Sequence, residues 1–173
     1  MRFFFSGVWG IAAAIALLAQ PAAAQAPRPS VQLERYEPDT IIIDTRARKL
    51  YYIEPSGAWL VYPIGVGRAG FAWHGKATVG RMAKWPEWVP PPQMRKRQPD
   101  LPHRMAGGYD NPLGARALYL YQGERDTLYR IHGTSEPWTI GQAVSSGCIR
   151  MHNGDVIDLY ARVQVGTTVV VLP

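Results

Sequence analysis

The residues best suited to chemistry lie in one stretch near the carboxyl end, the nonapeptide SSGCIRMHN at positions 145–153. This stretch contains Cys148, the one cysteine of the 173-residue chain, and His132 precedes that cysteine by sixteen residues. A cysteine and a histidine that a fold brings together form the minimal set for a thiol nucleophile and its general base. The pair therefore predicts nucleophilic catalysis, and the other elements must position it.

Cys148 is predicted to be a reactive thiol. A single cysteine cannot form an intrachain disulfide, and an unpaired cysteine in an exported protein suggests intermolecular pairing or a reactive thiol. The alternative is a buried cysteine that acts as a small apolar residue. The neighbours Ser146, Gly147 and Arg150 are not typical of a core, which favours the reactive thiol. An adjacent imidazolium would lower the thiol pKa from about 8.5 and stabilise the thiolate.

The general base is predicted to be His132, because it follows a strand-like run and strand ends commonly face a cleft. His152, four residues after Cys148, is the rival and would approach the sulfur if that stretch were helical. Asn153 is a good N-cap, and Asp155 suits a first helical turn. We therefore expect the helix to begin after His152.

Three further residues of the nonapeptide are candidates for binding an oxyanion or the substrate, namely Ser146, Gly147 and Arg150. Gly147 lets the backbone approach closely before the nucleophile, so that nearby N–H groups can face a developing oxyanion. The guanidinium fork of Arg150 suits a substrate carboxylate or carbonyl. A structural ion pair with Asp155 or Asp158 is the alternative role of Arg150.

Other chemistries fit the sequence less well. A zinc ion could be held by Cys148, His132, His152 and Asp155, but the chain has no Cys-x-x-Cys or His-x-x-x-His spacing. The glycines at positions 65, 67 and 70 lack the following helix that a dinucleotide site needs. A serine nucleophile in the nonapeptide would lack the Gly-x-Ser-x-Gly elbow. The cysteine and histidine remain the preferred pair.

The elements that must hold this pair are mainly strands. Runs rich in β-branched and apolar residues occur at 40–44, 50–54, 59–66, 115–121, 127–131 and 167–172, with a shorter run at 76–82. Apolar residues at helical spacing predict one short helix over 154–163. This pattern predicts a mainly β domain, either a sandwich or a barrel.

The segment 68–114 is rich in glycine, proline and tryptophan and shows no convincing helix or long strand. Long irregular segments in compact domains are usually functional loops or disordered insertions. The aromatic and proline content favours an ordered covering loop, and a mobile insertion is the alternative.

The amino-terminal residues predict export. Arg2 precedes an apolar run that ends at Ala19, and small residues near Ala24 and Ala26 fit a signal-peptidase site. We expect residues 1–24 to be a signal peptide, residues 25–38 a flexible tether and residues 39–173 one domain. An uncleaved membrane anchor is the alternative, but its apolar run would be short for a span, so no stable membrane insertion is expected after cleavage.

The formal charge of +6 suits an anionic surface or a carboxylate-rich substrate. No run of lysine and arginine resembles a nucleic-acid-binding stripe, and export also disfavours nucleic acid as a partner.

Several motifs together resemble a known family. The sequences HGT at 132–134 and SSGCIRM at 145–151, with GVG at 65–67 and DNPLG at 110–114, closely resemble the signature of the L,D-transpeptidase catalytic domain. The resemblance covers about residues 39–172. It implies a β-sandwich of mixed sheets with one short helix and a long covering loop, a periplasmic location, and no metal or organic cofactor.

The resemblance also implies a reaction on peptidoglycan stem peptides. Cys148 would attack the carbonyl of the third stem residue, usually a diamino acid, and expel the terminal D-alanine. His132, oriented by the backbone carbonyl of Gly133, would hold Cys148 as a thiolate and protonate the leaving amine. An amine of a neighbouring stem would then resolve the thioester and give a 3→3 crosslink.

Two positions depart from the family pattern. Ser146 stands where the broad family often has histidine, which bears on acceptor binding, and Thr78-Val79-Gly80 replaces a more rigid Thr-Pro-x-Gly turn. Three alternatives remain open: an L,D-carboxypeptidase with water as acceptor, an enzyme that anchors a lipoprotein lysine to the wall, and a non-catalytic wall-binding module. A binding module should keep a slow, ordinary thiol, whereas an activated thiolate should be alkylated fast below pH 7.

Overall fold

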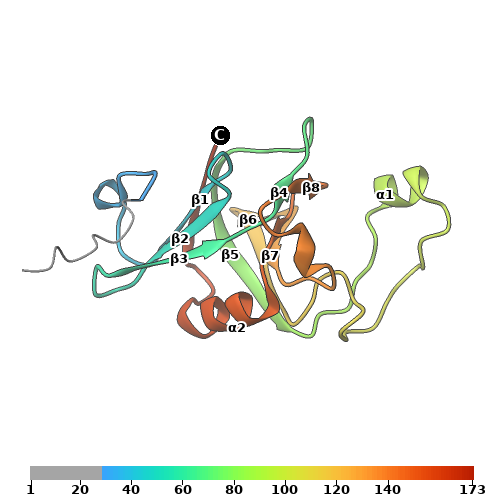
Figure 1. Cartoon of the computed structure of the whole chain (residues 1–173). Coiled ribbons are helices and arrows are strands. Elements are labelled where there is room, and N and C mark those ends of the chain that lie inside the picture. Colours follow the sequence, from blue (N-terminus) through green and yellow to red (C-terminus); the bar gives the residue numbers. More distant parts are fainter. Residues whose placement is uncertain (1–28) are drawn as a thin grey trace, which may run out of the picture.

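The protein is described by a computed structural model, which covers residues 29–173 (Figure 1). The expected signal peptide, both cleavage sites and the first residues of the expected tether lie outside these described residues. No helix within residues 29–173 is long and apolar enough to cross a membrane.

The prediction of a mainly β fold with mixed sheets is confirmed. Eight strands form one mixed sheet in the order β3-β2-β1-β10-β5-β6-β7-β9, and β4 pairs with β8 in a small second sheet. The β1–β10, β7–β9 and β4–β8 pairs are parallel and the others antiparallel. The strands are β1 (Thr40–Asp44), β2 (Lys49–Ile53), β3 (Trp59–Pro63), β4 (Val66–Gly67), β5 (Gly75–Lys84), β6 (Arg116–Gln122), β7 (Arg125–His132), β8 (Ala143–Ser145), β9 (Ile149–Arg150) and β10 (Thr168–Leu172).

The large sheet is strongly curled. Gly65, just beyond the edge strand β3, exchanges two backbone hydrogen bonds of 2.9 Å with Arg150 of the opposite edge strand β9. Side chains from both ends of the strand order, including Tyr62 and Ile149, therefore share one buried apolar cluster. Curling of this kind encloses a core without a second large sheet.

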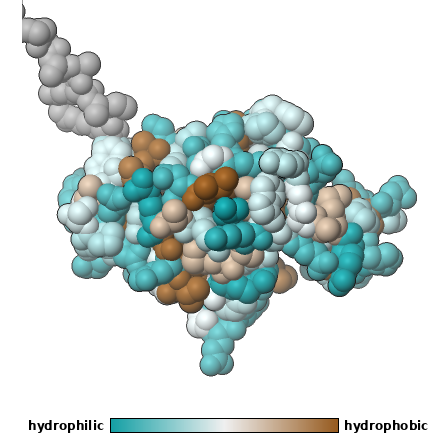
Figure 2. Space-filling view, turned by 90° about the horizontal axis from the view of Figure 1, so that it is seen from below, coloured by the Kyte–Doolittle hydropathy of each residue, from teal (hydrophilic) through white to brown (hydrophobic). Residues whose placement is uncertain are grey.

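The main helix, α2 (Asn153–Arg162), covers one side of this curled sheet (Figure 1). Its buried residues Val156 and Leu159 join the same apolar cluster as the strands. The helix begins after His152, as expected. The face seen from below carries only small, separate apolar patches among hydrophilic residues (Figure 2).

The segment before β1 packs on the sheet, although the sequence predicts a flexible tether there. Leu33, in the short 3-10 helix η1 (Leu33–Arg35), is buried in a second apolar cluster with Ile42 and Tyr51. The hydroxyl of Ser30 also donates to Asp44 at 2.6 Å. Alternating residues of β1 face opposite sides of the strand, so the outward side needs this cover.

The expected absence of helix and long strand from 68–114 is wrong. Strand β5 spans ten residues, and α1 (Pro92–Arg97) lies in the loop that extends away from the sheet (Figure 1). The Thr78-Val79-Gly80 segment is not a turn, since it lies inside β5, where the register shifts at Gly80. The loop is ordered by Asn111, whose buried amide donates to the carbonyls of Pro86, Met105 and Ala106.

Candidate active site

The parallel pairing of β7 and β9 brings the two parts of the predicted site together. Ile131 is aligned with Ile149, and His132 with Arg150. Both isoleucines are buried in the core. Because successive side chains alternate across a sheet, His132 and the residues on either side of Ile149 face the opposite side, where a cleft lies. The sheet register therefore places Cys148 and His132 in the same cleft.

The cleft encloses about 990 Å³ and runs between the sheet and the covering loop. Its walls include Cys148, His132, Ser146 and Arg150, together with residues of the loop before and after α1. The loop contributes mostly apolar and aromatic groups, namely Trp85, Pro86, Trp88, Val89, Pro90, Pro91, Pro92, Met94 and Leu101. A concave site with an apolar wall and a few convergent polar groups is typical of a ligand-binding site.

His132 is almost fully buried and its imidazole is fixed by one hydrogen bond. Nδ1–H donates to the backbone carbonyl of Gly133 at 2.5 Å, which leaves Nε2 as the basic nitrogen. The pKa of His132 is lowered to about 4, chiefly by burial and also by the charges of Arg150 and Arg130, while the hydrogen bond to the Gly133 carbonyl acts in the opposite direction. The imidazole is therefore neutral at pH 7 and can accept a proton.

Cys148 is half-buried, and its Sγ–H points to the backbone carbonyl of Leu128, 3.9 Å away. Burial raises the pKa of the Cys148 thiol, while the Arg130 N–H and the charges of Arg130 and Arg150 act in the opposite direction. The lowered pKa of His132 and the raised pKa of Cys148 favour a neutral thiol and a neutral imidazole over the thiolate–imidazolium pair expected from sequence.

Leu128 is a residue that the sequence analysis missed. Its φ of 63° lies in the left-handed region, which a branched, non-glycine residue enters only at an energetic cost. The side chain is 62% exposed and lines the cleft, and the carbonyl receives the Cys148 thiol. A leucine in a β-rich run gives no sequence signal for this conformation.

The turn before the nucleophile depends on Gly147 and Ser145. Gly147 has a φ of 111°, and a Cβ there would contact the ring of Tyr129 and approach the carbonyl oxygen of Phe71. The buried Ser145 hydroxyl donates to the Cys148 carbonyl at 2.6 Å and accepts from the Gly147 N–H at 3.1 Å. Ser145 thereby fixes the turn, a role indicated by serine two residues before glycine.

Arg150 lines the cleft but forms an ion pair other than the one considered from sequence. Its guanidinium contacts Glu136 at 2.7 Å and the Thr139 hydroxyl at 3.2 Å. Neither Asp155 nor Asp158 is its partner, and Asp158 instead binds Arg162 at 3.0 Å. The pairing with Asp155 or Asp158 was wrong because both residues lie on α2, away from the edge strand β9.

Asn153 is not the N-cap of α2, which is His152. The Asn153 side chain accepts from Ala115 N–H at 3.0 Å and Thr134 N–H at 3.2 Å, and donates to the Thr134 carbonyl at 3.0 Å. It thus binds the loop after His132 to the segment before β6. Thr134 and Asn153 are 19 residues apart in the chain, so no local sequence pattern could reveal this contact.

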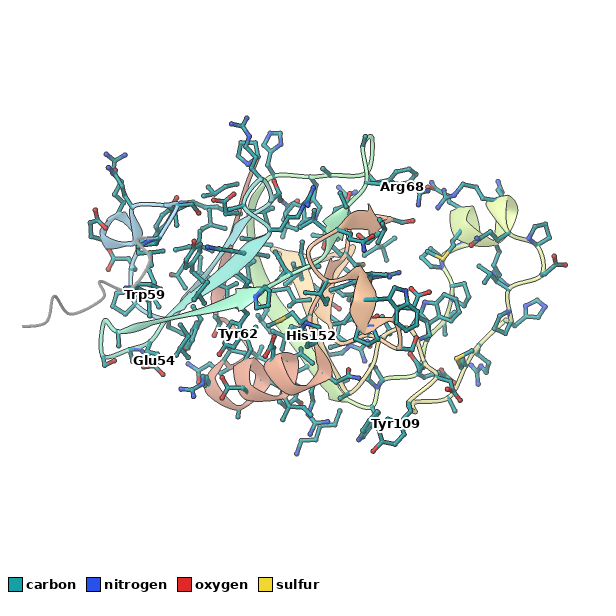
Figure 3. The ribbon with its side chains drawn as sticks, in the orientation of Figure 1. Glu54, Trp59, Tyr62, Arg68, Tyr109 and His152 are labelled. Atoms are coloured by element: carbon teal, nitrogen blue, oxygen red, sulfur yellow. The ribbon has the colours of Figure 1, made fainter. Side chains whose placement is uncertain are left out.

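The positions of the side chains support neither His152 as the base nor the zinc hypothesis. His152 is not among the residues that line the cleft, and it lies at the start of α2 (Figure 3). Among the described residues, no group of three or more histidine, cysteine, aspartate or glutamate side chains is arranged to hold a metal ion. The four candidate zinc ligands therefore do not converge.

Comparison with solved structures supports the fold. A chain titled "Probable carnitine operon oxidoreductase caia" from Brucella melitensis is 50% identical, with a TM-score of 0.53, and the match covers 79% of this chain and 88% of that one. L,D-transpeptidase 3 from Mycobacterium tuberculosis has a TM-score of 0.58 at 17% identity, over 78% of this chain and 60% of that chain. The second likeness concerns the fold alone.

Comparison of sequences identifies the family. A "Probable L,D-transpeptidase ErfK/SrfK" from Escherichia coli K12 is 39% identical over 148 residues, which is 78% of this chain and 46% of that protein. The chain thus spans about half the length of this curated relative. The sequence model of the L,D-transpeptidase catalytic domain matches residues 38–171, which include Cys148, His132 and the covering loop. The chain therefore belongs to the L,D-transpeptidase catalytic-domain family.

Proposed function

We propose that the protein is a cysteine-dependent L,D-transpeptidase of the bacterial cell wall that acts on peptidoglycan stem peptides. The observation that carries this proposal is the arrangement of Cys148 and His132 in one cleft, with Nδ1 of His132 occupied by the Gly133 carbonyl. This hydrogen bond selects the tautomer in which Nε2 accepts a proton. Family membership supports the same reaction.

The first half of the proposed reaction forms an acyl-enzyme. Nε2 of His132 takes the proton of Cys148 as Sγ attacks the carbonyl carbon of the third stem residue. Turn N–H groups near Gly147 stabilise the negative oxygen that develops. The intermediate then collapses, the carbon–nitrogen bond to D-alanine breaks, and the imidazolium returns its proton to the leaving amine, which leaves a thioester on Cys148.

The second half transfers the acyl group. His132 is neutral again and removes a proton from an acceptor amine, which attacks the thioester carbonyl. Breaking of the carbon–sulfur bond gives an amide, and the sulfur regains its proton from His132. With a neighbouring stem as the acceptor, the product is a 3→3 crosslink.

The neutral resting pair supports general-base catalysis rather than a permanent thiolate. A base acts well when it is unprotonated at the working pH and can reach the proton that it removes. The Cys148 thiol faces Leu128 in the resting structure, so the thiol must turn toward His132 when the substrate binds. Such catalytic contacts often tighten only in the complex.

Alternative acceptors use the same first step. Water would give an L,D-carboxypeptidase, and a lipoprotein lysine would anchor that protein to the wall. We propose a stem-peptide amine because the cleft encloses about 990 Å³ and its lining includes the solvent-exposed residues Leu128 and Val144. Export to the periplasm, with a signal peptide over residues 1–24, is part of the same proposal.

The oxidoreductase name of the Brucella melitensis relative receives no support from the site. Gly65, Gly67 and Gly70 of this chain are followed by a turn and strand β5, and no helix starts there within the described residues. A dinucleotide fingerprint requires a glycine-rich turn that opens a helix.

The test is incubation of the purified protein with a disaccharide-tetrapeptide, followed by intact-protein mass spectrometry and analysis of muropeptides. We expect an acyl adduct on Cys148, release of D-alanine and a crosslinked dimer, all absent from Cys148→Ala. Tripeptide without dimer would favour the carboxypeptidase or an acceptor missing from the mixture. A folded protein with neither adduct nor D-alanine release would contradict the proposal and favour a wall-binding module.

A further inference from the structure

The cleft is rich in positive charge. Its lining contains five cationic side chains and two carboxylates, the cations being Arg68, Arg81, Lys84, Arg130 and Arg150. Arg150 is paired with Glu136, and Arg130 is paired with Asp126 at 2.7 Å. The other carboxylate of the lining, Glu87, contacts Arg104. Within residues 29–173, Arg68, Arg81 and Lys84 have no carboxylate within salt-bridge distance.

Arg81 is the best placed of these three cations. The register of the sheet shifts at Gly80, so that Val79 is aligned with Leu120 while Arg81 is aligned with Tyr119. Without this bulge, Arg81 would share the side of the sheet that the buried Val79 occupies. The bulge therefore turns Arg81 away from the core and into the cleft.

The guanidinium of Arg81 is held in place by an aromatic ring. It lies 3.5 Å from the centroid of Tyr119, and the guanidinium of Arg130 lies 4.4 Å from the same centroid. Cation–π stacking occupies the face of a guanidinium and leaves its N–H edges available. Arg130 uses its edge on Asp126, with two bonds of 2.7 and 2.9 Å. The Arg81 guanidinium makes no hydrogen bond to any described residue.

Sheet register also relates Arg81 to the nucleophile. Arg81, Tyr119 and Arg130 are aligned across β5, β6 and β7, and Cys148 lies next to the Arg130 position. Adjacent strands are about 4.8 Å apart, so a group stacked above Tyr119 lies about 10 Å from the Cys148 backbone across two strand spacings. The terminal D-alanine carboxylate lies only one residue, about 3.8 Å, beyond the attacked carbonyl, so it spans this separation only in an extended arrangement. A side-chain carboxylate that lies several bonds farther from that carbonyl spans the separation in many conformations.

On these grounds we infer that Arg81 binds the side-chain carboxylate of a diamino dicarboxylic acid at the third position of the donor stem. This inference rests on the proposed function. Such a side chain carries its carboxylate several bonds away from the attacked carbonyl, and a guanidinium fork matches a carboxylate with two parallel hydrogen bonds. Arg81 is thus a specificity residue that distinguishes a free side-chain carboxylate from an amidated one.

The experiment compares three synthetic donor tetrapeptides. One has a free side-chain carboxylate at position three, the second has that carboxylate amidated, and the third has a free side chain but a carboxamide at the terminal D-alanine. Release of D-alanine, or of its amide, gives kcat/KM for the wild type, R81Q and R81K. Arg46→Gln is the matched control, because Arg46 is exposed in the β1–β2 turn and does not line the cleft.

The wild type should use the free-side-chain donor about tenfold better than the side-chain amide, since a hydrogen bond to a charged group contributes about that factor. For R81Q, kcat/KM should fall about tenfold on both donors with a free side chain, whichever terminus they carry. Its kcat/KM on the side-chain amide should equal that of the wild type. The kcat/KM of R81K on these donors should lie between the values for the wild type and R81Q, because lysine keeps the charge without the planar fork. Added salt should reduce the preference of the wild type.

Three results would overturn the inference. Equal losses by R81Q on all donors would show a structural role, which thermal unfolding of the variant would also reveal. A loss that disappears with the terminal amide would assign Arg81 to the D-alanine carboxylate. Release from no donor by a folded wild type would sink the proposed function itself, whereas release without any side-chain preference would remove the inference alone.

Discussion

The Asn153 side chain binds the backbone of Thr134 through both its oxygen and its nitrogen, at 3.2 and 3.0 Å. Thr134 follows His132 by two residues, so the first residue of α2 fixes the loop that carries the Gly133 carbonyl. The packing is tight, because a Cβ on Gly133 or Gly114 would meet the Asn153 oxygen. The orientation of the imidazole is therefore linked to the position of α2.

Asn153→Ala should lower the free energy of unfolding by about 2–4 kcal/mol, because three partly buried hydrogen bonds are lost and their partners stay in place. It should also reduce kcat, since Gly133 is no longer held. The measurements are urea unfolding and D-alanine release. The neighbouring Gly154→Ala is the control, because a Cβ there enters open space and alanine favours a helix. Equal stability of the two variants would contradict the role of Asn153.

Much of the fold, and the meeting of Cys148 and His132 in one cleft, could be predicted from the sequence for identifiable reasons. Strands such as β1 and β10 are short runs of β-branched residues, so local pattern alone predicts them. Cys148 and His132 stand out because few residue types can act as a nucleophile and a base. Their convergence depends on β9, which is too short to give a periodic signal.

The contacts that tune the site depend on residues far apart in sequence. The pairing of Arg150 with Glu136 requires the 3-10 helix η2 (Pro137–Thr139), and the Asn153 contacts bridge three segments. Burial lowers the pKa of His132 and raises the pKa of Cys148, and composition does not show burial. The bulge at Gly80 reverses which side of β5 Arg81 occupies, and a repeating pattern cannot locate that reversal.

Burial of His132 should make the protein sensitive to acid. Its pKa is about 4 in the folded state against about 6.5 in the unfolded chain, so the unfolded state binds the proton first as pH falls. The stabilising contribution is fully present above pH 6.5 and is lost between pH 6.5 and 4. The free energy of unfolding should fall by about 2 kcal/mol between pH 6.5 and 5 for this reason.

Urea unfolding at pH 7 and pH 5 tests this, with His132→Gln as the comparison. In the variant, the free energy of unfolding should fall less between pH 7 and pH 5, because the part due to His132 is absent. Asp126 and Asp158 also have lowered pKa values, which destabilise the folded state at lower pH, but they are present in both proteins and cancel. Parallel pH profiles for the wild type and the variant would show that His132 is accessible to protons when folded.

Alkylation of Cys148 should be slow at neutral pH without substrate. The raised pKa keeps the sulfur as a thiol, and the thiolate is the reactive form. We expect iodoacetamide to react more slowly than with free cysteine at pH 7, with a rate that rises steadily toward pH 9 and above. Intact-protein mass spectrometry over time measures the rate. Rapid modification below pH 7 would instead establish a standing thiolate, and slow alkylation does not by itself indicate a binding module.

The Arg150–Glu136 ion pair should contribute measurably to stability. The Arg150 side chain is only 19% exposed, and its guanidinium also bonds to Thr139. A double-mutant cycle with Arg150→Gln and Glu136→Gln should give a coupling of about 0.5–1 kcal/mol, the upper range for partly exposed pairs. The Arg104–Glu87 pair, at 3.5 Å and largely exposed, is the internal control and should show almost none. A coupling no larger than the control would mean that Arg150 is held by packing rather than charge.

Replacement of Gly147 should damage both folding and catalysis, for two separable reasons. The first is backbone strain, because a φ of 111° lies outside the regions that other residues readily adopt. The second is the collision of a new Cβ with the Tyr129 ring, which is stacked on Trp73 with centroids 4.7 Å apart and cannot easily move aside. Gly141→Ala isolates the first cause, since Gly141 also has a positive φ of 82° but its Cβ would meet only open space.

Gly141→Ala should therefore cost about 1–2 kcal/mol of unfolding free energy. Gly147→Ala should cost about 1–3 kcal/mol more, because overpacking adds to the strain. Loss of D-alanine release should be confined to Gly147→Ala, in which the displaced turn carries Cys148 away from His132. Urea unfolding and D-alanine release for both variants give the comparison. Equal costs would mean that the Tyr129 ring yields to the methyl group, and unchanged turnover in Gly147→Ala would show that the turn does not position the nucleophile.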